Sequence, residues 1–158
     1  MLVSDMRVHL PELPEYAANV LASLWMQGPK KSATLVALRG ELGSGKTTFV
    51  QTLLRRLGVK ENIQSPTYVL MKTYPLDGPL TTFGERRRFN RVMHIDAYRL
   101  KNAAEFAALQ PVEFLQDPKA LVLLEWPERV EGALPPPDLT INFSSEGASE
   151  GERFIEIC

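Results

Sequence analysis

The sequence predicts an α/β fold, a three-layer sandwich built around a mixed, mostly central β-sheet. Apolar runs that suit buried strands alternate along the chain with segments that have helical periodicity, and this alternation is typical of α/β proteins. Hydrophobic residues make up 44% of the chain and charged residues 23%, which is ordinary for a globular protein. The length of 158 residues fits one domain over residues 1–158.

The first third of the chain is predicted to form an edge strand, a helix, a buried strand and a second helix. Residues 7–10 form the short strand, which the following prolines close. Apolar residues recur at three- and four-residue steps over 15–27, which predicts a helix with one buried face. The apolar run 34–38 is typical of a strand covered on both faces. The second helix is expected over 46–57, before Gly58.

The remainder of the chain is predicted to contain five strands and two short helices. The strands are expected at 68–74, 91–96, 120–124, 139–143 and 153–157, and the helices at 103–109 and 112–115, with Asn102 as an N-cap. The segment 75–90 contains two prolines and two glycines, which predicts an exposed hairpin tip.

A glycine-rich segment lies between the first buried strand and the second helix. Residues 40–47 read Gly-Glu-Leu-Gly-Ser-Gly-Lys-Thr and match the Walker A pattern of P-loop proteins. Glycines permit the backbone turns that point several N–H groups at one phosphate, and the helix that follows adds the positive end of its dipole. The predicted ligands are ATP and Mg²⁺. The residues expected to bind the nucleotide are Glu41, Leu42, Gly43, Ser44, Gly45, Lys46, Thr47 and Thr48.

Two acidic residues at strand ends are candidates for binding the metal and for activating water beside this loop. Lys46 is expected to neutralise phosphate charge during catalysis, and the Thr47 hydroxyl is expected to bind magnesium. Glu125 follows the most apolar strand and is predicted to hold the metal, directly or through a water. Asp96 ends another strand and is predicted to orient or deprotonate the attacking water. The alternative for each acid is an exposed strand-end carboxylate or a structural ion pair, with Arg99 as the partner in the case of Asp96.

Four further features have two interpretations each. Thr67 is either a switch residue that senses the terminal phosphate or a hydroxyl that bonds a local turn. His94 is either catalytic or a packed, hydrogen-bonded residue. Trp126 is either part of the core or a lid over the site. The basic cluster, Arg86, Arg87, Arg88 and Arg91, is either a solvated loop or a contact for RNA phosphates or an acidic partner.

Four segments in this order resemble one small family. They are residues 39–48 (Arg-Gly-Glu-Leu-Gly-Ser-Gly-Lys-Thr-Thr), 65–68 (Ser-Pro-Thr-Tyr), 94–100 (His-Ile-Asp-Ala-Tyr-Arg-Leu) and 124–128 (Leu-Glu-Trp-Pro-Glu). The chain is similar to the bacterial tRNA threonylcarbamoyladenosine biosynthesis ATPase family, TsaE, from the first predicted helix to about Phe143. The segment 76–91 departs from the family by being longer and more basic.

The resemblance implies an ATPase that works with the TsaB–TsaD pair to install threonylcarbamoyl on tRNA, without transferring the group itself. It also implies that Thr47 and Glu125 are magnesium ligands, that Asp96 is the hydrolytic acid and that Thr67 is the switch threonine. A contact with tRNA is expected to be indirect, or to run through the basic cluster.

Other classes of protein remain as alternatives or are disfavoured. A regulatory GTPase is disfavoured because no Asn-Lys-X-Asp segment is present. A small-molecule kinase with Arg86 to Arg88 as a lid, and a non-catalytic scaffold gated by ATP, are the two rivals. The net charge of −1 argues against a protein that mainly coats nucleic acid. One cysteine, Cys158, and no apolar signal or membrane-spanning run predict a cytoplasmic protein without membrane contact.

Overall fold

A computed structural model describes residues 6–63, 71–78, 86, 88–109 and 111–158. Its strands are β1 (Met6–His9), β2 (Thr34–Arg39), β3 (Met71–Pro75), β4 (Arg91–Asp96), β5 (Ala120–Glu125), β6 (Leu139–Ser144) and β7 (Glu152–Ile157). Its helices are α1 (Leu13–Met26), α2 (Lys46–Arg56), α3 (Ala103–Ala108) and α4 (Val112–Leu115), with 3-10 turns η1 (Leu10–Glu12) and η3 (Pro127–Val130). Thr67, Arg87 and the part of the predicted strand before Met71 lie outside these residues.

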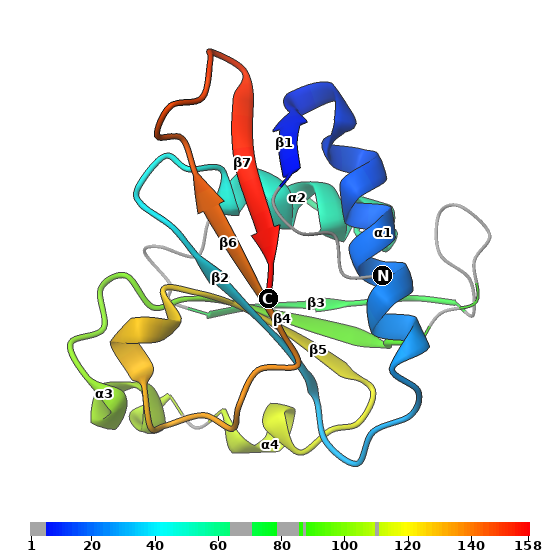
Figure 1. Ribbon diagram of the computed structural model, residues 1–158. Helices are drawn as coiled ribbons and strands as arrows, with labels where there is room; N and C mark the ends of the chain where they lie inside the picture. The colour runs from blue at the N-terminus through cyan, green and yellow to red at the C-terminus, as the bar shows by residue number, and fades with distance from the viewer. Residues whose placement is uncertain (1–5, 64–70, 79–85, 87, 110) are drawn as a thin grey trace.

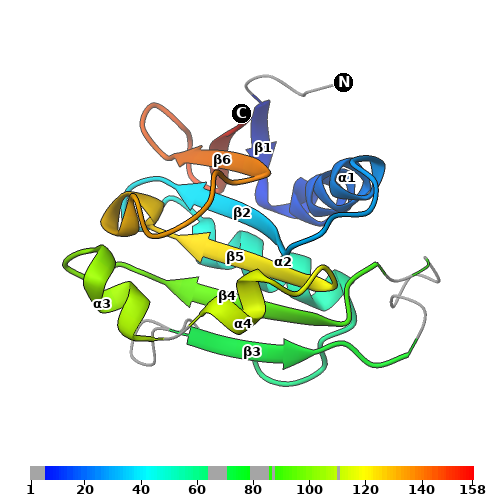
Figure 2. The same ribbon diagram turned by 90° about the horizontal axis from the view of Figure 1, so that it is seen from below.

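The strands form one mixed sheet in the order β1-β7-β6-β2-β5-β4-β3. Strands β6, β2, β5 and β4 run parallel, as the arrows in Figure 2 show, while β3, β7 and β1 pair antiparallel with their neighbours. Strand β2 lies between β6 and β5 and runs parallel to both. The loop that follows β2 therefore leaves the sheet at the edge where the parallel strands have their carboxyl ends. Ligands of open α/β sheets bind at this edge.

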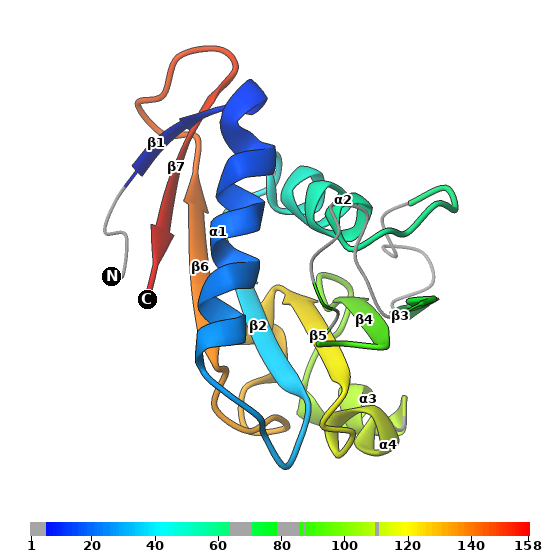
Figure 3. The same ribbon diagram turned by 90° about the vertical axis from the view of Figure 1, so that its right-hand side faces the viewer.

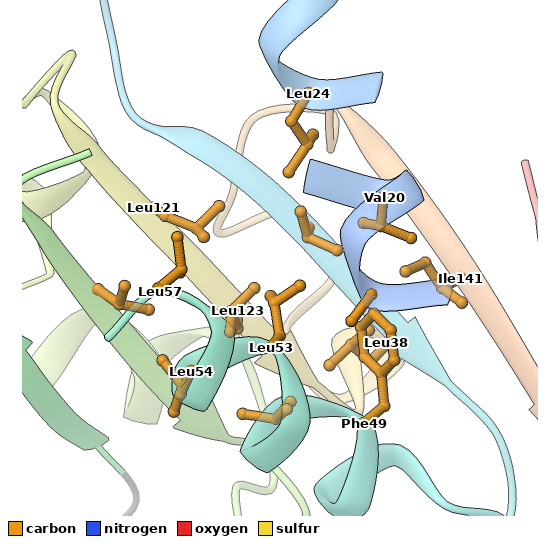
Figure 4. Close-up of a cluster of buried hydrophobic side chains, with 14 of the residues drawn as sticks. Val20, Leu24, Leu38, Phe49, Leu53, Leu54, Leu57, Leu121, Leu123 and Ile141 are labelled. Atoms are coloured by element: carbon orange, nitrogen blue, oxygen red, sulfur yellow. The ribbon is translucent and has the colours of Figure 1, made fainter. Parts of the chain in front are cut away.

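Helices cover both faces of the sheet, which makes the predicted three layers. Helices α1 and α2 lie on one side, and α3 and α4 lie on the other (Figures 1 and 3). Figure 4 shows the first interface, where side chains of α1 and α2 meet those of β2, β5 and β6. The residues buried there include Val20, Leu24, Phe49, Leu53, Leu38, Leu123 and Ile141. The alternate strand residues, among them Leu35, Val122 and Leu124, pack with Phe106 on the opposite face.

The strand sequences explain which strands are central. All six residues of β5 and the first five of β2 are buried, which requires cover on both faces. Strand β6 instead alternates buried and half-buried residues, because only the face that joins the core under α1 and α2 is fully covered. The predicted N-cap of α3 is confirmed, since the Asn102 side chain accepts a hydrogen bond from the Glu105 backbone N–H at 3.0 Å.

Two sequence-based predictions were wrong in detail. Helix α1 begins at Leu13, two residues earlier than expected, because Pro14 lies in the first helical turn, where a missing N–H costs nothing. The base of the predicted exposed hairpin tip is part of the core, with Leu76 at 6% and Phe89 at 4% exposure. The Leu76 N–H donates to the Asn90 carbonyl at 2.8 Å. The backbone hydrogen bonding between β3 and β4 therefore continues beyond the ends of the two strands.

Candidate functional site

The glycine-rich loop, residues 40–45, turns sharply between β2 and α2. Gly40, Gly43 and Gly45 have φ values of 145°, 76° and 105°, a region that side chains disfavour. Gly40 also has no room for a side chain, because a Cβ there would lie 2.4 Å from the Phe143 carbonyl oxygen and 2.7 Å from Ser44 Oγ. The two ends of this loop therefore require glycine, one for space and one for the turn into the helix.

Gly40→Ala is expected to lower the free energy of unfolding by about 3 kcal/mol, because backbone strain adds to the clash with Phe143. Gly132→Ala is the matched control. Gly132 also has a positive φ, of 85°, but a Cβ there meets nothing within 4 Å. Urea unfolding of both variants measures the difference. Equal losses of stability would show that the close approach at Gly40 is unimportant.

Lys46, the first residue of α2, reaches back across the loop. Its Nζ donates to the Gly40 carbonyl at 2.5 Å and the Glu41 carbonyl at 2.9 Å, and it lies 4.4 Å from the centre of the Trp126 ring. The side chain is buried, at 5% exposure. Burial lowers the pKa of Lys46, while the charge of Glu125 acts in the opposite direction. A buried ammonium group whose partners are neutral carbonyl oxygens is suited to pair with an anion.

The two predicted acids lie side by side at the ends of adjacent parallel strands. Asp96 of β4 is in register with Glu125 of β5, and both are buried on the face that carries α2. Glu125 Oε1 accepts a hydrogen bond from Thr47 Oγ1 at 3.0 Å. Asp96 Oδ1 accepts one from the Tyr98 backbone N–H at 3.0 Å. The fold thus brings four predicted residues, Lys46, Thr47, Asp96 and Glu125, into one site.

The oxygens of Thr47 and Glu125 fit a magnesium ion. Hard oxygen ligands suit Mg²⁺, which is commonly held by one or two protein groups together with phosphates and water. Among the described residues no group of three or more His, Cys, Asp or Glu side chains is arranged to hold a metal by itself. An ion at Thr47 and Glu125 would therefore depend on the oxygens of a bound phosphate.

His94 is a hydrogen-bonded residue of the site, which the sequence left open. Its Nε2 lies 2.7 Å from Glu125 Oε2, and both side chains are almost fully buried. Its Nδ1 has no hydrogen-bond partner among the residues that the structure describes. The tautomer with its proton on Nε2 donates to the carboxylate and leaves only a lone pair unpaired. His94 and Thr47 together fix both oxygens of Glu125.

Trp126 forms one wall of the site. Its backbone is left-handed, with φ of 61° and ψ of 52°, and its N–H donates to the Leu38 carbonyl at 3.2 Å. The indole packs on the Tyr98 ring with centroids 5.0 Å apart and faces the Lys46 ammonium. Among the described residues it is the only non-glycine with a positive φ, and strain of this kind is frequent at functional sites.

The remaining loop residues differ in their surroundings. Glu41 is exposed, and its Oε1 accepts hydrogen bonds from the Ser145 backbone N–H at 2.7 Å and from Ser145 Oγ at 2.8 Å. The backbone bond is the main reason that the pKa of Glu41 is lowered. Ser44 is buried, whereas Leu42 is 67% exposed and Thr48 is also exposed. Glu41 thus ties the loop to the turn after β6.

The structure separates the members of the predicted basic cluster. The Arg88 guanidinium donates to the Leu24 and Gly28 carbonyls at the end of α1. Arg91 pairs with Asp117 at 2.7 Å and stacks on Phe114. Arg86 is exposed, and Arg87 lies outside the described residues. Arg88 and Arg91 therefore make contacts within the fold, and Arg86 is the exposed member of the cluster among the residues that the structure describes.

The sheet order, the glycine-rich loop and the acids beside it define an α/β protein with a P-loop NTPase-like fold. The chain belongs to the TsaE family, since the family model described as threonylcarbamoyl adenosine biosynthesis protein TsaE matches residues 13–155. This family is involved in the biosynthesis of threonylcarbamoyladenosine in tRNA.

Individual relatives agree. The chain is 34% identical over 144 residues to the tRNA threonylcarbamoyladenosine biosynthesis protein TsaE of Rickettsia felis, covering 90% of this chain and 75% of the relative. It is 31% identical to the Haemophilus influenzae protein of the same name, covering 72% of this chain and 64% of the relative, which is less than two thirds of that relative's length. A solved structure, the crystal structure of Bacillus subtilis YdiB, matches with a TM-score of 0.67 and 26% identity, covering 99% of this chain and 86% of that chain.

No helix in the described part of the chain combines the length and the apolar character needed to cross a membrane.

Proposed function

We propose that this chain is an Mg-ATP-binding P-loop ATPase that supports threonylcarbamoyladenosine modification of tRNA in the cytoplasm, in a complex with TsaB and TsaD. The observation that carries the proposal is the convergence of Lys46, Thr47, Asp96 and Glu125 at the loop between β2 and α2. Phosphate-binding loops of this type supply backbone N–H groups, one lysine, one hydroxyl and acids on neighbouring strands.

Each side chain has a distinct role in this proposal. Lys46 exchanges its bonds to the Gly40 and Glu41 carbonyls for bonds to phosphate oxygens. Thr47 and Glu125 hold magnesium, which neutralises phosphate charge when bound. Asp96, in register beside Glu125, orients or deprotonates the attacking water. Thr67 is proposed as the residue that responds to the terminal phosphate.

The partner is proposed to be the TsaB–TsaD pair, with tRNA contacted only indirectly. The internal bonds of Arg88 and Arg91 favour this version over direct RNA binding through the basic cluster. They also disfavour the kinase alternative, since a lid over a transferred phosphate needs mobile arginines, whereas Arg88 is bonded to the end of α1.

Hydrolysis of ATP by the purified protein is expected to be weak alone and to rise when a TsaB–TsaD pair from a related bacterium is added. Partner-dependent NTPases are slow alone when a partner completes the site. Phosphate release, measured with and without the pair, tests this directly. Vigorous turnover that ignores the pair, or a burst of ADP only with a small metabolite, would overturn the proposal.

A further inference from the structure

His94 lies behind the predicted metal-binding residues, on the face of the sheet that carries α2. It is two residues before Asp96 on β4, and alternate residues of a strand share one face, here the face on which Val92 joins the core. Strand β4 is bonded to a neighbour on each side, and His94 is in register with Lys72 of β3 and Leu123 of β5. Its side chain is 0% exposed. The ring is therefore held by the core of the protein rather than by a loop.

The two carboxylate oxygens of Glu125 have different partners. Oε1 accepts a hydrogen bond from Thr47 Oγ1 at 3.0 Å, whereas Oε2 lies 2.7 Å from His94 Nε2. An ionised carboxylate can only accept, so Nε2 is a protonated nitrogen of the ring. The other ring nitrogen, Nδ1, has no partner among the residues that the structure describes, so the bond to Glu125 is the contact that orients the ring there. The imidazole thus holds one oxygen of Glu125 and leaves the other to Thr47.

A carboxylate held in this way can offer a single oxygen to a metal ion. Mg²⁺ demands a near-ideal octahedron with bonds of about 2.0–2.1 Å, so neighbouring ligands in its shell are about 3.0 Å apart. Thr47 Oγ1 and Glu125 Oε1 are separated by 3.0 Å. Ca²⁺ forms longer bonds, accepts more ligands and often takes both oxygens of one carboxylate. Two-oxygen binding by Glu125 would require Oε2 to leave His94.

We propose that His94 is a positioning residue that restricts Glu125 to metal binding through one oxygen and thereby selects Mg²⁺ over Ca²⁺. This inference rests on the proposed function, because it needs Thr47 and Glu125 to hold the metal. Loss of the bond to Oε2 would leave the buried ring N–H of His94 without a partner, which is costly inside a protein. That cost opposes two-oxygen binding and leaves one-oxygen binding unaffected. His94 acts only through Glu125 and contacts neither the nucleotide nor the attacking water.

The test measures ADP binding by calorimetric titration at increasing Mg²⁺ or Ca²⁺ for wild type, His94→Phe and His94→Gln. Phenylalanine keeps a ring in the core without the donor, whereas the glutamine amide can place an N–H near the position of Nε2. In His94→Phe, the Mg²⁺ concentration that half-saturates ADP binding is expected to rise about tenfold, the usual effect of losing a group that orients a metal ligand. The corresponding Ca²⁺ concentration is expected to stay at the wild-type value or to fall. The preference for Mg²⁺ therefore drops about tenfold in His94→Phe and is largely restored in His94→Gln.

Val92→Ala is the matched control for a general loss of core packing. Val92 is 0% exposed on the same strand and face, but it is in register with Leu121, at the start of β5, rather than with its carboxyl end. Val92→Ala is expected to lower the thermal stability and to leave both metal requirements unchanged.

Equal weakening of Mg²⁺ and Ca²⁺ binding in His94→Phe would show a structural role alone and overturn the inference, as would an unchanged preference. A wild-type protein that binds no ADP, or binds it without need of a metal, removes the proposed metal site as well, and the wild-type titration alone identifies that case. His94→Asn, whose amide is too short to reach Oε2, replaces the phenylalanine variant if thermal melting shows that the latter is misfolded.

Discussion

Lys46→Met is expected to abolish nucleotide binding, raising the Kd for Mg-ATP and Mg-ADP by about a hundredfold or more. The ammonium is the positive charge inside the loop, and its burial makes each bond to phosphate stronger than the same bond in water. Methionine keeps most of the length and apolar volume of the lysine stem against Trp126. Binding titrations measure the loss.

The same variant is expected to keep the thermal stability of the wild type. Because burial lowers the pKa of Lys46, the folded chain holds this proton less tightly than the unfolded chain does. The charge therefore opposes folding at pH values below the lowered pKa, and its removal relieves that cost. The freed carbonyls of Gly40 and Glu41 lie near the surface, where water replaces the ammonium.

Lys60→Ala is the control for a general effect of charge, since Lys60 is exposed and follows α2 at the end opposite to the loop. Its nucleotide affinity is expected to equal that of the wild type. Unimpaired binding and hydrolysis by Lys46→Met, at wild-type stability, would show that the loop is not a phosphate site.

Asp96→Asn is expected to lower ATP turnover by about 10²–10⁴-fold, the usual contribution of a general base, with Mg-nucleotide binding retained. Glu125→Gln is expected to weaken the apparent affinity for Mg²⁺ about tenfold or more, because it removes the charge that faces Thr47 Oγ1. Single-turnover hydrolysis and the Mg²⁺ dependence of ADP binding separate the two effects.

Glu131→Gln is the control, because Glu131 is 71% exposed and its side chain pairs with Arg39. The reverse pattern, with magnesium affinity lost in Asp96→Asn and kept in Glu125→Gln, would exchange the two roles. An Asp96→Asn protein that no longer hydrolyses ATP yet fully supports tRNA modification would favour the ATP-gated scaffold.

Most of the fold was predictable because local patterns in this chain agree with the tertiary structure. The helical periodicity of α1 and α2 and the continuous apolar runs of β2 and β5 match their final burial. The sharp turn of the glycine-rich loop could be predicted as well, since the Walker A pattern places glycines, lysine and threonine at fixed spacing. The hairpin was mispredicted because Leu76 and Phe89 are buried by continuation of the ladder, which local composition does not reveal.

The sequence by itself determined the fold class, the glycine-rich loop with its Walker A pattern and the identities of Asp96 and Glu125 as strand-end acids. Only the tertiary structure decided their neighbours, because strand order and register bring together residues that are far apart in the chain. It paired His94 with Glu125 and bonded Arg88 to the end of α1. It also packed the Arg153 side chain of β7 against Gly45. A local motif is visible in the sequence because its residues are adjacent in the chain, whereas the side chains from other strands reach the same site only through packing.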